Sequence, residues 1–215
     1  MLPISAENWH RLIEANRMAV QDGWAAPGVF ATGIGPDYRP GGFLYVGKSA
    51  GRPPPEAVGS GIDLGASMEA WTRWMIERRN LSPFWQFADR IDRTRRSIAW
   101  TNVCKMDVRG GGRPPLGRQW QQVAAACLAM LREELEMLAP KAVVFAISKA
   151  YLLDIEAMIG AEVYRLVPSH LDGDGWTKVY AAGLGRYAVT TRHPQGWPSP
   201  DRDRVIDQLR SLLDP

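Results

Sequence analysis

Apolar residues recur at two spacings along this chain, and the two spacings alternate. A helical spacing predicts helices over residues 6–21, 67–79, 83–94, 118–138, 148–159 and 201–213. Short apolar runs predict strands over residues 43–47, 97–103, 141–147, 162–167 and 187–191. Strands that alternate with helices are typical of a parallel sheet covered on both faces. The pattern therefore predicts one three-layer α/β domain with a mostly parallel sheet, spanning residues 1–215.

Polar residues follow three of the predicted strands. The run Gly47-Lys48-Ser49-Ala50-Gly51 ends the first strand, Asn102 and Lys105 end the second, and His193 follows the last. In an open parallel sheet, ligands bind in the crevice beyond the carboxyl ends of the strands. Asn102 offers both a donor and an acceptor, as reading a nucleobase edge requires. His193 is suited to stabilising a developing oxyanion or to acid–base chemistry, so these strand ends are the candidate site.

The glycine run admits two further interpretations. It fits the G-x-S-x-G pattern of a serine-hydrolase nucleophile elbow, with Ser49 as nucleophile, His193 as base and Asp172 or Asp174 as acid. An elbow turns directly from strand into helix, which the prolines after Arg52 oppose. The other interpretation is a tight turn that uses the backbone freedom of glycine.

Composition and charge exclude several classes of protein. The chain has 215 residues, of which 46% are apolar and 23% charged, with a formal net charge of +3. No run of about 18 apolar residues occurs, so no membrane span is expected, and the first residues lack the features of a signal peptide. Cys104 and Cys127 are too few for a disulfide framework or a four-cysteine metal site. We expect both to be reduced and buried in a cytoplasmic protein.

Two connections combine arginine with proline or glycine, and a third places a tryptophan beside prolines. Arg52 precedes three prolines, Arg109 and Arg113 enclose a glycine run, and Trp197 stands beside a proline loop. Arginines neutralise phosphates, and an apolar wedge fills the gap that a flipped base leaves in a duplex. These loops therefore indicate a nucleic-acid partner, although ordinary solvated loops have the same composition.

The order of these motifs along the chain resembles that of the uracil-DNA glycosylase superfamily. The resemblance spans roughly residues 43–213 and is most specific from Asn102 to Phe145. It rests on the glycine motif at 47–51, Thr101-Asn-Val-Cys-Lys105, Arg113-Pro-Pro115, Leu138-Ala-Pro-Lys141 leading into Ala142-Val-Val-Phe145, and His193-Pro194. It implies a three-layer α/β/α sandwich around a central, mostly parallel four-stranded sheet. It also implies an active site at the carboxyl ends of the strands.

The resemblance also implies roles for particular residues. Gly47, Lys48, Ser49 and Gly51 would hold the base and the attacking water, Asn102 would read the base edge with Lys105 beside it, and His193 would stabilise the leaving base. Gln195 and Trp197 would enter the minor groove, while Arg52, Arg109 and Arg113 would contact DNA. Ser49 stands where the family usually has a carboxylate or an asparagine, and serine is a poor general base without help.

We therefore expect a monomeric DNA N-glycosylase that removes uracil or another deaminated or damaged base in base excision repair. It would flip the target nucleotide from its DNA partner and would need no metal, cofactor or membrane. Two cysteines are too few for the four-cysteine iron–sulfur cluster of some branches. Because the first motif lacks a carboxylate, a catalytically inactive nucleic-acid- or nucleotide-binding protein of the same fold is the alternative. A serine hydrolase using Ser49 and His193 is a remote one.

Overall fold

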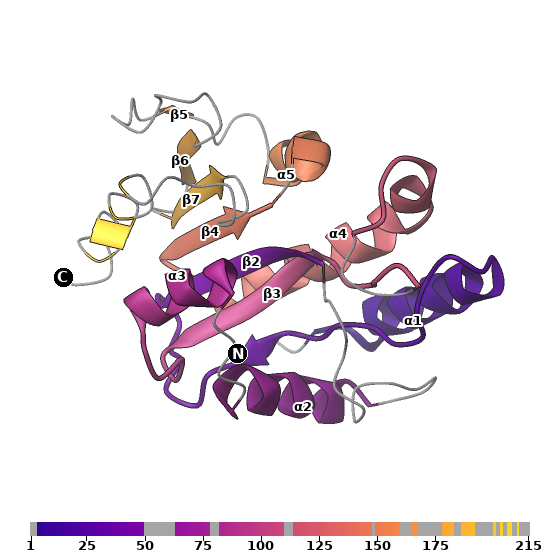
Figure 1. Ribbon diagram of the computed structural model, residues 1–215, viewed down its shortest axis with the longest axis horizontal. Coiled ribbons are helices and arrows are strands. Elements are labelled where there is room, and N and C mark those ends of the chain that lie inside the picture. The colour runs from indigo at the N-terminus through magenta and orange to yellow at the C-terminus, as the bar shows by residue number, and fades with distance from the viewer. Residues whose placement is uncertain are drawn as a thin grey trace.

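The computed structural model describes residues 4–49, 63–77, 82–109, 114–147 and 149–159, together with 165–166, 178–182, 186–191 and five helical positions at 200, 203, 206, 207 and 210. These residues form an α/β fold in which helices cover both faces of an open sheet (Figure 1). The expected α/β class, with parallel strands at the centre of the sheet, is therefore confirmed.

The sheet has a parallel centre and antiparallel edges. Its strand order is β1-β3-β2-β4-β7-β6-β5, and the four central strands β3, β2, β4 and β7 run parallel. The edge strands β1, β6 and β5 are each antiparallel to their inner neighbour. The strand bounds are β1 Gly33–Ile34, β2 Phe43–Ser49, β3 Ile98–Cys104, β4 Ala142–Ala146, β5 Arg165–Leu166, β6 Lys178–Ala182 and β7 Arg186–Thr191.

The central strands are apolar because both of their faces are covered. All seven positions of β3 and all five of β4 are buried, as expected for parallel strands between two helical layers. Their register aligns Leu44 with Ala99 and Val143, and Val143 with Ala188. The carboxyl ends of β3, β2, β4 and β7 therefore meet at one edge of the sheet.

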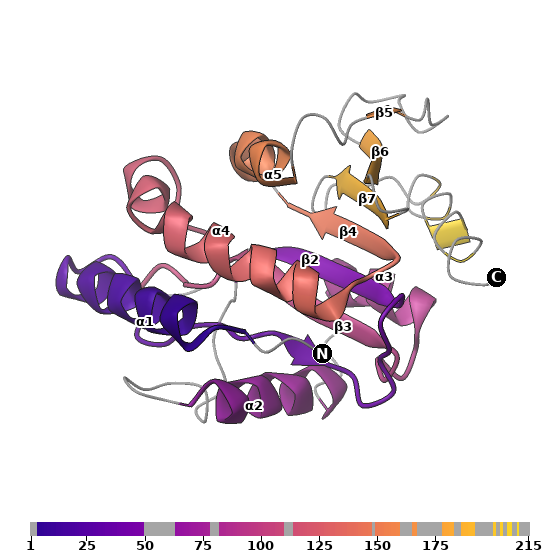
Figure 2. The same cartoon turned by 180° about the vertical axis from the view of Figure 1, so that it is seen from behind.

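Three helices lie on one face of the sheet and two on the other. Helix α4 (Arg118–Leu138) crosses β2 and β3 with α1 (Ala6–Gln21) and α5 (Leu152–Ile159) beside it, and a short 3₁₀ turn, η2 (Lys149–Tyr151), precedes α5 (Figure 2). Helices α2 (Leu64–Glu77) and α3 (Pro83–Ile91) cover the opposite face. This arrangement is consistent with a three-layer sandwich.

Local signals explain where several helices begin and end. The Ser5 hydroxyl accepts a hydrogen bond from the Asn8 amide at 3.2 Å and so caps α1. Proline occupies the first position of α3, where its missing amide proton costs nothing. Helix α4 ends at Ala139, which adopts a left-handed conformation (φ 43°) just before Pro140.

An aromatic cluster fills the space between β3 and the two helices α2 and α3. Trp100 of β3 contacts Trp71 and Trp74 of α2 and Trp85 of α3, with ring centroids 4.8 to 5.6 Å apart. Arg95 places its guanidinium 4.3 Å from the centre of the Trp85 ring and bonds to Asp89 and to the Met75 carbonyl. This cluster holds α3 firmly against the sheet.

Most of the predicted elements match the structure, and the mismatches are informative. The helices expected over 6–21 and 118–138 have those bounds, and Cys104 and Cys127 are free and buried. Strand β2 continues two residues beyond the expected 43–47, and α2 begins at Leu64 rather than 67. Four of the five expected strands form the parallel centre of the seven-stranded sheet, and the fifth, expected over 162–167, contains β5, whereas β1 and β6 were not predicted. No helix in the described part of the chain is long and apolar enough to cross a membrane.

Candidate functional site

The site is best defined where β2 and β3 end side by side. Gly47 and Asn102 are register partners on these parallel strands, so their Cα atoms present the same face of the sheet. A Cβ atom on residue 47 would collide with the side-chain oxygen of Asn102 and would lie 3.2 Å from two ring atoms of Phe84. Glycine at 47 therefore creates a recess that the Asn102 carboxamide occupies.

The carboxamide of Asn102 is buried without being satisfied. Asn102 is 1% exposed, and its Nδ2 atom has no hydrogen-bond partner among the residues that the structure describes. A buried donor left unpaired costs about 1–3 kcal/mol, so such groups are uncommon in native proteins. An asparagine held this way is preorganised for a ligand that supplies the missing acceptor.

Phe84 forms one wall of the recess, and its position is fixed by stacking. Its ring lies nearly parallel to that of Tyr45, with centroids 4.1 Å apart and an interplanar angle of 22°. It also meets the Trp85 ring edge-on at 5.2 Å. A planar ligand beside Asn102 would therefore meet a rigid aromatic neighbour. Sequence reasoning missed Phe84 as a site residue because 37 positions separate it from Gly47 along the chain.

Tyr45 supports Phe84 from inside the sheet. Its hydroxyl is buried, and burial raises the pKa of the phenol well above its usual value. It therefore stays neutral at physiological pH and does not act as an acid or base there.

Ser49 and Lys48 lie at the end of β2. Ser49 pairs with Cys104 of β3, so the chain is still extended at Ser49. A nucleophile elbow needs a sharp turn at the serine, so this geometry does not favour the serine-hydrolase interpretation. Side chains alternate along a strand, which places Ser49 on the face of Gly47 and Lys48 on the opposite face.

Lys48 is half-buried, and no hydrogen bond or ion pair of its side chain occurs within the described residues. Burial disfavours the charged amine and lowers the pKa of Lys48. Among the residues that the structure describes, the amine therefore has no counter-ion at the carboxyl edge of the sheet.

Lys105 was expected to contact the substrate, but its ammonium group is engaged inside the protein. It is fully buried and donates to Thr101 and to Glu134 of α4. The Thr101 hydroxyl also donates to the same Glu134 oxygen at 2.7 Å. This network joins β3 to α4 on the far face from Phe84, and we do not include Lys105 in the proposed site.

The last strand leads the chain back to the same edge. Thr191 of β7 is in register with Ala146 of β4, and His193 follows two residues later in the sequence. The other predicted residues outside the described part of the structure are Gly51, Arg52, Arg113, Gln195 and Trp197, together with Asp172 and Asp174. Arg109 is described, and its side chain is exposed.

The strand order adds an independent argument for this location. After β2 the chain enters β3 on one side and then crosses to β4 on the other. Such a reversal is a topological switch point, where ligands of open α/β sheets bind. The recess at Gly47 and Asn102 lies beside that point.

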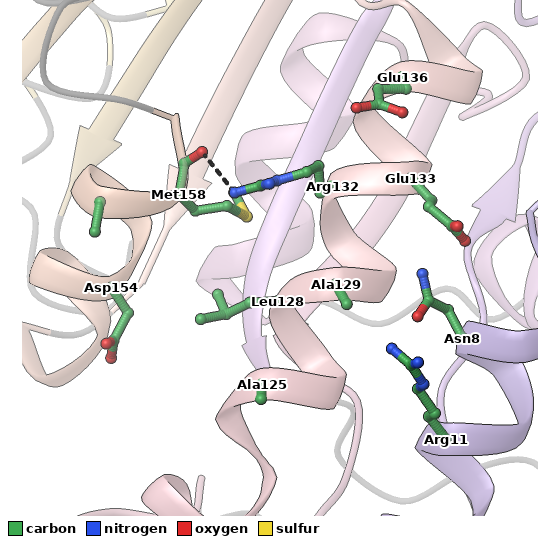
Figure 3. Close-up of a pocket in the computed structure, with 11 residues that line it drawn as sticks. Asn8, Arg11, Ala125, Leu128, Ala129, Arg132, Glu133, Glu136, Asp154 and Met158 are labelled. Atoms are coloured by element: carbon green, nitrogen blue, oxygen red, sulfur yellow. Dashed lines mark hydrogen bonds between the residues drawn. The ribbon is translucent and has the colours of Figure 1, made fainter.

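Another concavity lies on the helical layer formed by α1, α4 and α5. A groove of about 650 Å³ runs over α4 between α1 and α5 (Figure 3). Its floor is formed by Ala125, Leu128 and Ala129, and Arg132 reaches across to the carbonyl oxygen of Met158 at 3.4 Å. No residue expected in the site lines this groove. The described side chains include no group of three His, Cys, Asp or Glu residues placed to hold a metal ion.

Comparison with known proteins adds no family to this picture. A scan against protein-family models finds no match. A search of curated proteins also finds none.

Proposed function

We propose that the protein is a DNA N-glycosylase of the uracil-DNA glycosylase type, which flips a deaminated or damaged base to the carboxyl edge of the sheet beside Asn102 and hydrolyses its glycosidic bond. The observation that supports this most directly is the buried Asn102, whose Nδ2 lacks a partner beside Gly47 and the ring of Phe84. A flipped base would supply an acceptor for Nδ2 and a flat face for Phe84.

In this proposal, each strand end has a distinct task. Asn102 of β3 reads the base edge, and the missing side chain at Gly47 leaves room for its carboxamide. His193, after β7, donates to the oxygen on which charge builds as the base departs. The charge of Lys48 favours the same departing anion at longer range. Ser49 and neighbouring backbone groups hold the attacking water.

One observation favours a second candidate, a nucleic-acid- or nucleotide-binding protein without glycosylase activity. The end of β2 carries Gly47, Lys48 and Ser49 and no carboxylate. Without a carboxylate, the water has no strong base in this motif, and binding could persist without turnover.

The deciding experiment measures base release from labelled oligonucleotides that carry uracil, hypoxanthine or xanthine. The wild type is compared with His193→Ala and Asn102→Ala. His10→Ala and Asn8→Ala, both on α1 and away from the sheet edge, are the matched controls.

Release that is lost in both site variants and kept in both controls would support the glycosylase proposal. No release from any substrate, with Asn102-dependent binding of DNA, would replace it with the binding protein. Release that is unaffected by both site variants would refute the assignment of the site.

A further inference from the structure

Beyond the end of β3, the chain at Val108 and Arg109 runs beside the segment that follows α1, at Trp24 and Ala25. Ala25 and Val108 form an isolated antiparallel bridge, and the Arg109 amide donates to the Trp24 carbonyl at 2.7 Å. Trp24 and Arg109 are therefore neighbours at the same edge of the molecule as the recess. Arg109 lies seven positions after Asn102 in the sequence, a span of at most about 25 Å.

A polar groove of about 780 Å³ lies beside Trp24. It is lined by Asp22, Trp24, Arg118, Gln119, Gln121 and Gln122. The indole nitrogen of Trp24 donates to Gln122 Oε1 at 2.9 Å, and the Gln122 amide nitrogen donates to Asp22 Oδ2 at 2.6 Å. This chain of bonds fixes the ring orientation and engages the acidic group of the groove, while the indole stays partly exposed.

Two arginines near Trp24, Arg109 and Arg118, differ from the other described arginines in their side-chain contacts. Every other arginine whose side chain the structure describes has a bonding or ring partner, as in the pairs Arg17–Glu14 and Arg96–Asp37. Arg109 and Arg118 are exposed and have no such partner in the described part of the chain. Arg118 therefore lines the groove beside the rigidly held indole, and Arg109 is joined to Trp24 through its backbone amide.

We infer that this groove binds the nucleic-acid strand that flanks the flipped nucleotide, with Arg109 and Arg118 on backbone phosphates and Trp24 stacked on an unpaired base. This inference rests on the proposed function and extends it to the neighbouring nucleotides. Guanidinium groups bind phosphates in bidentate fashion, and an aromatic ring stacks on any base without regard to sequence. The glutamine amides along the groove provide further donors for phosphate or base oxygens.

The test measures binding of a fluorescein-labelled single-stranded 20-mer without damaged bases, by anisotropy over a range of salt concentrations. The variants are Arg109→Gln, Arg118→Gln, Trp24→Leu and Trp24→Phe. Arg132→Gln is the control because Arg132 is an exposed arginine on the same helix as Arg118 and lines the other groove. Thermal melts establish that each variant is folded.

Each arginine variant should weaken binding several-fold and reduce the slope of log affinity against log salt by about 0.7. Trp24→Leu should weaken binding about tenfold, whereas Trp24→Phe, which keeps a stacking face, should retain most of it. Arg132→Gln should match the wild type.

The possible failures are distinguishable. Arginine variants that behave like Arg132→Gln, while the wild type binds, would overturn the groove and leave the glycosylase proposal intact. Binding that depends on Arg109, Arg118 and Trp24 in a protein without base release would support the groove and refute catalysis. A wild type that does not bind the 20-mer would overturn the groove.

Discussion

The side-chain oxygen of Asn102 lies over the bare Cα of Gly47, its register partner on the neighbouring parallel strand. The position of the Asn102 carboxamide requires glycine at 47, since any other residue would place a Cβ atom against its oxygen. Five testable predictions concern this pair and the charged groups Lys48, Lys105 and Asp92.

Gly47→Ala should displace the Asn102 side chain and abolish base release. The added methyl group also meets the ring of Phe84 at 3.2 Å, so overpacking should cost about 1–3 kcal/mol of stability. Release assays and urea denaturation measure the two effects. Gly65→Ala is the control, because its methyl would meet only the carboxylate of Asp63. Normal release by Gly47→Ala would contradict the proposed role of the recess.

Asn102→Leu should abolish base release and leave the protein as stable as the wild type or more so. Leucine has a similar shape and removes a buried donor that has no partner among the described residues. Thermal denaturation checks the stability. The control is Asn16→Leu, because buried Asn16 bonds to the Ala26 carbonyl and the Gly28 amide at 3.1 Å each. That variant should lose about 1–3 kcal/mol. An equally large loss in Asn102→Leu would identify Asn102 as a structural residue.

Lys105→Met should be strongly destabilising because it leaves the Glu134 carboxylate buried without its cation. Removing one partner of a buried ion pair costs about 3–5 kcal/mol. The double variant Lys105→Met/Glu134→Leu should recover most of that loss, since it buries no charge. Urea denaturation of the three proteins gives the comparison. If the single variant were as stable as the double variant, burial of the Glu134 carboxylate would not require the Lys105 cation.

Asp92→Asn should be less stable than the wild type above about pH 4, and the difference should shrink as pH falls toward 2. Partial burial raises the pKa of the Asp92 carboxyl, but hydrogen bonds from Thr94 and Ser97 outweigh it and lower the pKa to about 2. Because the folded pKa lies below the unfolded value, this stabilisation is present above the unfolded pKa and is lost as pH falls toward 2. Urea denaturation from pH 2 to 7 tests the trend. Ser97→Ala should show a smaller version of it, and a constant difference at all pH values would refute it.

Lys48→Met should be more stable than the wild type at pH 7. Burial lowers the pKa of Lys48, so the folded state binds its proton less readily than the unfolded state does. The stability of the wild type therefore rises as pH climbs through the lowered pKa toward 10.5, and the gap to Lys48→Met should close there. Denaturation at pH 7, 9 and 10.5 measures the gap. A gap that widens with pH would show that the amine has a stabilising partner.

The fold class could be predicted from the sequence because local patterns determine it. The stripe of apolar residues over 118–138 gives α4 its bounds, and the continuous apolar run at 142–146 identifies β4 as a buried strand. Strands β1 and β6 were not predicted, each for a different reason. Strand β1 has only two residues within a glycine- and proline-rich segment. Strand β6 follows a polar stretch of the sequence, and it is defined by its antiparallel pairing with β5 and β7.

The site could be predicted only in part, because a sequence indicates which residues end a strand and does not indicate which side chains they contact. Asn102 was identified from its place at a strand end, and the structure adds that its amide is unpaired. Lys105 follows three residues later, but the tertiary contact with Glu134 draws it to the opposite face. Phe84 was noted only as one of several aromatic residues in its helix, because its place beside Gly47 comes from packing against Tyr45.

The aromatic cluster has an optical consequence. The Trp100 and Trp85 rings contact each other with centroids 4.8 Å apart, and Trp85 touches the same Phe84 that walls the recess. Indoles this close exchange excitation energy, so their emission reports the geometry of the whole group. A ligand that bound beside Asn102 and shifted Phe84 would therefore change the intrinsic fluorescence of the protein.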